Sequence, residues 1–212
     1  LVSRHGFAQI LLKRLAFCGA LVPLLWLIAA AFGIAGLSLG PNPSRELLHF
    51  TGKTALNLLW IGLLASPLRM LTGDPAWIRP RRIVGLFAFG YALLHFAIYA
   101  ALELGLDFSD LAREIVKRPF IVVGTLALLL LVPLAATSTD RMMRRLGRRW
   151  QSLHRLVYPA TILVVWHFWW QVKKDVTEPL LYATALALLL GFRWWRAQAR
   201  RDPQASNTQR GT

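Results

Sequence analysis

The 212-residue sequence contains little charge, and most of that charge is of one sign. Charged residues make up 17% of the chain and apolar residues 56%, and the mean hydropathy is +0.46. A soluble domain usually carries about a quarter of charged residues, so the composition favours a membrane protein. The net charge of +15 does not indicate nucleic-acid binding, because the basic residues lie between apolar runs instead of along one soluble face.

Cysteine is nearly absent from the sequence. The single Cys18 excludes an internal disulfide framework and a Cys-x-x-Cys pair. The motif Cys-x-x-Cys-His is also missing from the sequence, which excludes a covalently attached c-type heme.

Long apolar stretches are the most prominent feature of the sequence. Six of them reach or approach the roughly 20 residues that cross a bilayer. They lie at residues 15–44, 46–68, 83–102, 119–139, 156–172 and 179–195. We interpret the first as a retained helix, because its apolar run is too long for a signal peptide. The sequence therefore predicts an all-α fold, a bundle of six transmembrane helices.

The distribution of lysine and arginine predicts the orientation of this bundle. Most of the 25 basic residues lie before the first span, between spans two and three, between spans four and five, and after the sixth. Cytoplasmic loops collect positive charge, so both termini are expected in the cytoplasm. We expect a cytoplasmic segment at 1–14, the transmembrane domain at 15–196 and a disordered cytoplasmic tail at 197–212.

Three histidines, His95, His154 and His167, lie in or at the edge of these spans, where an ionisable side chain is costly and usually functional. His95 follows Arg82 by 13 residues and His167 follows Arg155 by 12. Spans three and five run in the same direction, so both histidines lie roughly 18–20 Å past the cytoplasmic charge. Two imidazoles at equal depth can hold one iron from opposite sides, which predicts heme. The alternative is an interhelical hydrogen bond at each histidine.

The position of His154 is compatible with more than one role. It precedes His167 by 13 residues, about 20 Å along the same helix and on a different face. It can serve a second cofactor or line the route of electron entry, but Arg81 and Arg82 occupy the matching depth on span three. The alternative is an interfacial histidine, and we read His49 in that way.

Arginines are concentrated in the segment 141–149, and Arg81 and Arg82 form a second cluster on the same side. The ordinary role of such clusters is orientation and contact with anionic membrane lipid. A further possibility is that the clusters hold the phosphate of a flavin or dock an acidic electron donor. The residues considered for that role are Arg81, Arg82, Arg148 and Arg149.

The chain resembles the MsrQ family, the heme-binding membrane subunit of a bacterial periplasmic methionine sulfoxide reductase system, within the ferric-reductase-like transmembrane group. The run RRWQSLHRLVY at 148–158 is the most specific part of the resemblance. The resemblance also rests on residues 49–60, 79–105, 117–139 and 146–170.

This resemblance implies a multi-pass cytochrome b of the bacterial inner membrane that contains heme b and FMN. His95, His154 and His167 match the heme-associated histidines. Electrons would come from the quinone pool or a cytosolic flavin reductase and pass to a periplasmic molybdopterin-containing methionine sulfoxide reductase, supporting repair of oxidised proteins. The sequence shows no Gly-x-Gly-x-x-Gly fingerprint and no recognisable catalytic site, so we expect a non-catalytic electron-transfer subunit.

Three alternatives to this function remain open. The first is a stand-alone ferric or quinone reductase without a repair partner. The second is a small proton-coupled transporter whose buried histidines relay protons, although inverted repeats and broken helices are not evident in the sequence. The third is a structural assembly factor.

Overall fold

The computed structural model describes residues 4–107, 113–114, 117–172 and 175–199, with side chains from residue 10 onward. The α-helices are α1 (Arg4–Ala31), α2 (Pro43–Thr72), α3 (Arg81–Ile98), α5 (Pro119–Ala136), α6 (Asp140–Leu146), α7 (Arg148–Leu153), α8 (Val157–Gln171) and α9 (Thr177–Ala199). The shorter helical segments are η1 (Ile34–Gly36), η2 (Pro75–Ile78), η3 (Tyr99–Glu103) and η4 (His154–Leu156). Every regular element in the described part of the chain is thus a helix, which confirms the all-α prediction.

The chain divides into two compact units, Leu1–Gln171 and Val172–Thr212. The first unit contains α1 to α8 and therefore all three singled-out histidines. The second contains α9. The expected tail at 197–212 lies almost entirely outside the described residues.

Local sequence signals fix the ends of α2. The Asn42 side chain accepts a hydrogen bond from the Arg45 backbone N–H at 3.3 Å, which satisfies one of the unpaired donors of the first turn. Pro43 follows at the first helical position, where its missing N–H costs nothing. At the other end Gly73 adopts a left-handed conformation with φ 73°, which glycine reaches without steric cost.

Four helical stretches are long and apolar enough to cross a membrane. They are Ile10–Ala31, Pro43–Thr72, Pro75–Glu103 and Pro119–Ala136. These correspond to the first four expected spans. The fifth and sixth expected spans fall on α8 and α9, and the six-span arrangement stays a prediction.

The first helix differs from the apolar run that predicted it. The uncharged stretch extends to residue 44, whereas α1 ends at Ala31. Gly33, Ala35, Gly36 and Gly40 then adopt positive φ angles, a conformation that ends a right-handed helix. Apolar composition alone does not report this change of backbone conformation.

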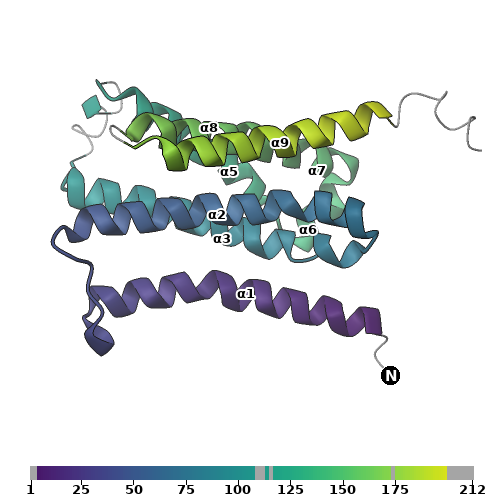
Figure 1. Ribbon diagram of the computed structural model, residues 1–212, viewed down its shortest axis with the longest axis horizontal. Coiled ribbons are helices and arrows are strands. Elements are labelled where there is room, and N and C mark those ends of the chain that lie inside the picture. Colours follow the sequence, from purple (N-terminus) through teal and green to yellow (C-terminus); the bar gives the residue numbers. More distant parts are fainter. Residues whose placement is uncertain (1–3, 108–112, 115–116, 173–174, 200–212) are drawn as a thin grey trace, which may run out of the picture. The chain divides into compact units, whose positions relative to one another are not determined.

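Small residues allow the helices of the first unit to pack closely. Figure 1 shows α2 and α3 lying side by side, and α5 and α8 form a second pair. The buried core contains Ala55 of α2, Ala88 of α3 and Ala160 of α8, and such small side chains let backbones approach one another in membrane bundles. α1 packs on α3, where the Tyr91 hydroxyl donates a 2.8 Å hydrogen bond to the Ala20 carbonyl.

Large apolar side chains remain on the surface of these helices. Phe32, Leu129 and Leu188 are among the most exposed. Soluble monomers rarely present such extensive apolar surface, and a lipid environment would cover it. The protein is a membrane protein with several membrane-spanning helices.

Polar and cation–π contacts lie near the two ends of the helix in the second unit. Its helix α9 follows Asp175, whose carboxylate accepts a hydrogen bond from the Thr177 backbone N–H at 2.9 Å. Hydrogen bonds from the side chain and backbone of Thr177 lower the pKa of the Asp175 carboxyl. Near the other end the Arg196 guanidinium lies 5.7 Å from the centre of the Phe192 ring, an arrangement suited to a cation at the edge of an apolar zone.

Removing the Tyr91 hydroxyl should weaken the attachment of α1. Tyr91→Phe should lower the free energy of unfolding by about 0.5–1.5 kcal/mol, because one buried hydrogen bond is lost. Thermal unfolding in detergent micelles measures the change. Tyr99→Phe is the matched control, since the described residues show no hydrogen bond at its hydroxyl. Equal melting temperatures for the two variants would contradict a role for the bond between Tyr91 and Ala20.

Candidate metal centre

His95 lies near the end of α3 and is held by the backbone of α2. Its Nδ1 atom is 3.0 Å from the Leu48 carbonyl oxygen. A carbonyl oxygen can only accept a hydrogen bond, so Nδ1 carries the proton and Nε2 retains the lone pair of the neutral ring. The contact therefore fixes both the ring orientation and the tautomer that can bind a metal.

His167 on α8 is held in the same way by α5. Its Nδ1 atom donates to the Phe120 carbonyl at 2.6 Å. This carbonyl belongs to the second residue of α5. Metal-binding histidines usually donate their second ring N–H to a carbonyl or carboxylate, which orients the ring and raises its basicity.

The two imidazole rings, one on α3 and one on α8, lie close together in an edge-on arrangement. Their centres are 6.2 Å apart and their planes are inclined by 82°. A first-row metal such as zinc lies about 2.0–2.1 Å from an imidazole nitrogen, and that nitrogen is about 1.1 Å from the ring centre. Two rings that share one ion from opposite sides would therefore have centres about 6.2–6.4 Å apart. The observed separation matches this value.

Two glycines make room for these rings. A Cβ atom built on Gly52 of α2 would lie 3.1 Å from Nδ1 and Cε1 of His95. A Cβ atom on Gly124 of α5 would lie 2.8 Å from Nδ1 and 2.9 Å from Cε1 of His167. Each histidine thus packs against a backbone surface that another residue would block. Neither glycine was predicted from the sequence, although a glycine inside an apolar helical run is a signal of close backbone approach.

The donor set also limits which group the site can hold. Within the described residues there is no cluster of three or more His, Cys, Asp or Glu side chains suited to a metal ion. A bare ion would therefore lack ligands here. A porphyrin supplies four equatorial nitrogens itself and needs only two axial ligands, so the pair His95 and His167 fits a heme. The buried hydroxyl of Thr125, next to Gly124, has no hydrogen-bond partner among the described residues.

The structure places His154 apart from this pair, in η4 at the start of α8. Its Nε2 atom is 3.2 Å from the Thr137 hydroxyl oxygen. Because this hydroxyl donates to the Pro133 carbonyl at 2.6 Å, it accepts from His154. The His154 ring also stacks on Trp150, with centres 3.9 Å apart. Partial burial lowers the pKa of His154, and the nearby positive charge of Arg81 lowers it further.

The four arginines considered for a flavin or donor site lie on two elements. Arg82 forms an ion pair with Asp140 of α6, and Arg81 is near enough to influence His154. Arg148 and Arg149 are exposed at the start of α7. His49 is exposed on α2, and its position at the membrane interface stays a prediction. The role of the arginines stays a prediction.

Comparison with known proteins places this architecture in a family. Residues 51–165 match the model of the ferric reductase like transmembrane component. The chain is 47% identical over 207 residues to the protein-methionine-sulfoxide reductase heme-binding subunit MsrQ of Xanthomonas axonopodis pv. citri, covering 96% of this chain and 95% of that relative. The chain belongs to the MsrQ family.

Other members support the same assignment. The MsrQ of Bordetella pertussis is 45% identical over 191 residues, which cover 87% of this chain and 91% of that relative. The MsrQ of Xanthomonas campestris pv. campestris strain 8004 is 54% identical over 165 residues, or 77% of this chain and 76% of that relative. Membership of the MsrQ family, which the sequence motifs predicted, is thereby confirmed.

The glycine next to His167 should be more sensitive to substitution than other helical glycines. Gly124→Ala should lower the free energy of unfolding by about 1–3 kcal/mol, because the added methyl group overlaps the imidazole. Gly90→Ala on α3 is the matched control, since a Cβ atom built there would have open space within 4 Å. That control should gain about 0.5–1 kcal/mol from the better helix former. Thermal unfolding gives the melting temperature of each variant. Equal melting temperatures for Gly124→Ala and Gly90→Ala would show that the close approach of Gly124 to His167 is not essential.

Proposed function

We propose that this MsrQ-family chain binds one b-type heme between His95 and His167 and acts as an electron-transfer subunit. The observation that carries the proposal is the separation of 6.2 Å between the two imidazole centres. The relatives are named heme-binding subunits of protein-methionine-sulfoxide reductase, which supports the same cofactor. Heme iron can take up and release one electron at a time.

The contribution of the chain is to hold and tune the two axial ligands. The carbonyls of Leu48 and Phe120 accept the Nδ1 protons, so each neutral imidazole presents Nε2 with raised basicity. Both rings are partly buried. Axial ligands, hydrogen bonding to those ligands and burial are the features through which a protein sets the potential of a heme.

The wider function follows from the family. We propose that the chain crosses the bacterial inner membrane six times with both termini in the cytoplasm, the transmembrane domain extending over residues 15–196. Its electrons pass to a periplasmic molybdopterin-containing methionine sulfoxide reductase subunit that repairs oxidised proteins. The donor in this proposal is the quinone pool or a cytosolic flavin reductase.

We also propose roles for four arginines and for His154 at the cytoplasmic end, where electrons would enter. FMN, or an acidic donor protein, would contact Arg81, Arg82, Arg148 and Arg149, where positive charge favours phosphate and carboxylate groups. His154 lies beside Arg81 at this end and would line the route of entry. To bind iron through Nε2, His154 would first have to give up its contact with the Thr137 hydroxyl.

Replacing either axial histidine should remove most of the heme. His95→Ala and His167→Ala each leave one axial position without a protein ligand, so the purified variants should lose the low-spin b-type spectrum. The measurement is a reduced-minus-oxidised absorption spectrum with pyridine hemochrome quantitation. His49→Ala is the matched control, because His49 is exposed and should leave the heme content unchanged.

Two results would contradict this heme assignment. A full and unshifted low-spin spectrum in either axial variant would show that the histidine concerned is not a ligand. Absence of heme from the wild-type protein, after expression with ample heme, would overturn the proposal and favour the proton-coupled transporter.

A further inference from the structure

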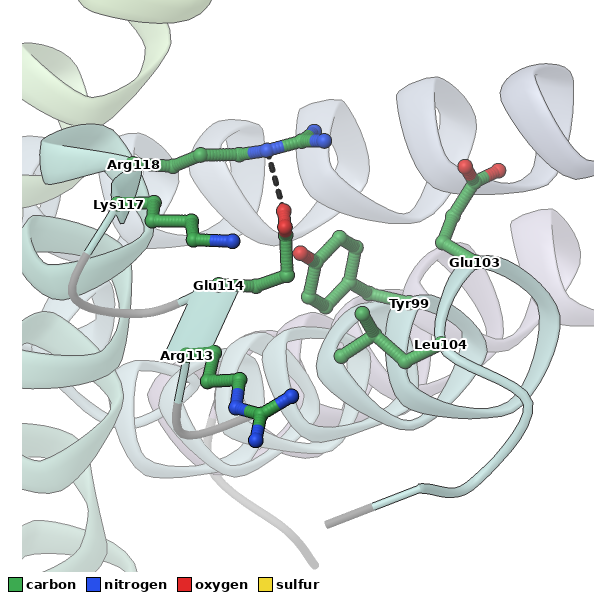
Figure 2. A pocket seen from close by; sticks show the side chains of 7 residues that line it. All are labelled: Tyr99, Glu103, Leu104, Arg113, Glu114, Lys117 and Arg118. Atoms are coloured by element: carbon green, nitrogen blue, oxygen red, sulfur yellow. Dashed lines mark ion pairs between the residues drawn. The ribbon is translucent and has the colours of Figure 1, made fainter. Parts of the chain in front are cut away.

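A polar pocket of about 320 Å³ opens where α5 begins. Figure 2 shows its lining side chains gathered around the ring of Tyr99. They come from η3, from the residues just before α5 and from the described pair 113–114. The lining residues are Tyr99, Glu103, Leu104, Arg113, Glu114, Lys117 and Arg118.

The pocket lies about one helical turn from the histidine pair. Tyr99 follows His95 by four residues, and its backbone N–H bonds to the His95 carbonyl, so the two residues share a helix face. Arg118 precedes Phe120 by two residues, and the Phe120 carbonyl holds His167. The helical turn that follows His95 and the start of α5, whose Phe120 carbonyl binds His167, therefore both lie next to this pocket.

Positive charge dominates the side of the pocket nearest to α5. Arg118 forms an ion pair with Glu114, and Figure 2 shows Lys117 directed toward the same carboxylate. The Glu103 carboxylate points away from Lys117 and Arg118 in this view. An anion that entered the pocket would thus meet three cations, Arg113, Lys117 and Arg118, and two carboxylates, those of Glu103 and Glu114.

In the described part of α3, no cation lies within two turns of His95 in the opposite direction. One and two turns back along α3 lie Tyr91 and Ala88, both buried in the apolar core with Leu131 and Ala160. The hydroxyl of Tyr91 is committed to the Ala20 carbonyl. A carboxylate buried there would be unpaired, and an unpaired buried charge is strongly unfavourable.

A b-type heme carries two carboxylates that need polar surroundings. We propose that Lys117 and Arg118 bind the two propionate groups of the heme held by His95 and His167, and that Glu114 competes with them for Arg118. This inference rests on the proposed heme site and adds the residues that neutralise its charge. It also explains why a mixed-charge pocket adjoins a pair of partly buried histidines.

The test is the midpoint potential of the heme in the purified protein. Cations near the heme stabilise its reduced form, which carries one more electron. Lys117→Gln and Arg118→Gln should each shift the reduction equilibrium toward the oxidised form by about tenfold, which is about 59 mV for one electron. Glu114→Gln should shift it in the opposite direction, because the competing carboxylate is removed.

Two controls separate direct pairing from a general effect of charge. Arg45→Gln removes one exposed cation from the first turn of α2, outside the pocket, and should shift the equilibrium by less than twofold. Reconstitution with heme dimethyl ester removes the propionate charges. Arg118→Gln should bind native heme about tenfold less tightly than wild type, and with the dimethyl ester this difference in affinity should fall below twofold, because no carboxylate remains to pair with Arg118.

The outcomes distinguish this inference from the function on which it rests. Shifts of the potential no larger than that of Arg45→Gln, or a loss of heme affinity in Arg118→Gln that persists with the dimethyl ester, would overturn the propionate assignment. If the wild-type heme is present and is lost in His95→Ala and His167→Ala, such shifts overturn this inference alone. A wild-type protein without heme would overturn the proposed function itself.

Discussion

Two hydrogen bonds between imidazoles and main-chain carbonyls organise this membrane unit. The Nδ1 atoms of His95 and His167 are bound to the carbonyls of Leu48 and Phe120, and each bond joins the helices of one packed pair. The bonds place the proton on Nδ1, so Nε2 of each neutral ring keeps the lone pair that can bind a metal. Gly52 and Gly124 are needed because the rings lie so close to the opposing backbones. Site geometry and helix packing are therefore consequences of the same contacts.

The sequence predicted the part of the site that depends on depth. His95 and His167 are about equally far from basic residues at the start of their helices, and the constant rise of a helix converts this spacing into a common level. The structure brings their rings together. Apolar runs predicted six spans, and the first four correspond to helices that are long and apolar enough to cross a membrane, because burial in lipid depends on composition and length.

The parts that the sequence did not predict depend on local backbone geometry. The carbonyl partners Leu48 and Phe120 cannot be identified from residue type, since every residue has a carbonyl. The end of α1 at Ala31 depends on the positive φ angles that follow, and the apolar run gives no sign of them. The contact of His154 with Thr137 also joins residues from separate helices, and no spacing rule relates them.

The central claim is that His95 and His167 are the two axial ligands of one heme. Its most direct test is the low-temperature electron paramagnetic resonance spectrum of the purified ferric protein. Two imidazoles at an interplanar angle of 82° predict a low-spin signal of the strongly anisotropic kind given by nearly perpendicular axial rings. A high-spin signal from five-coordinate iron, or a low-spin signal that survives in His95→Ala and His167→Ala, would contradict the claim.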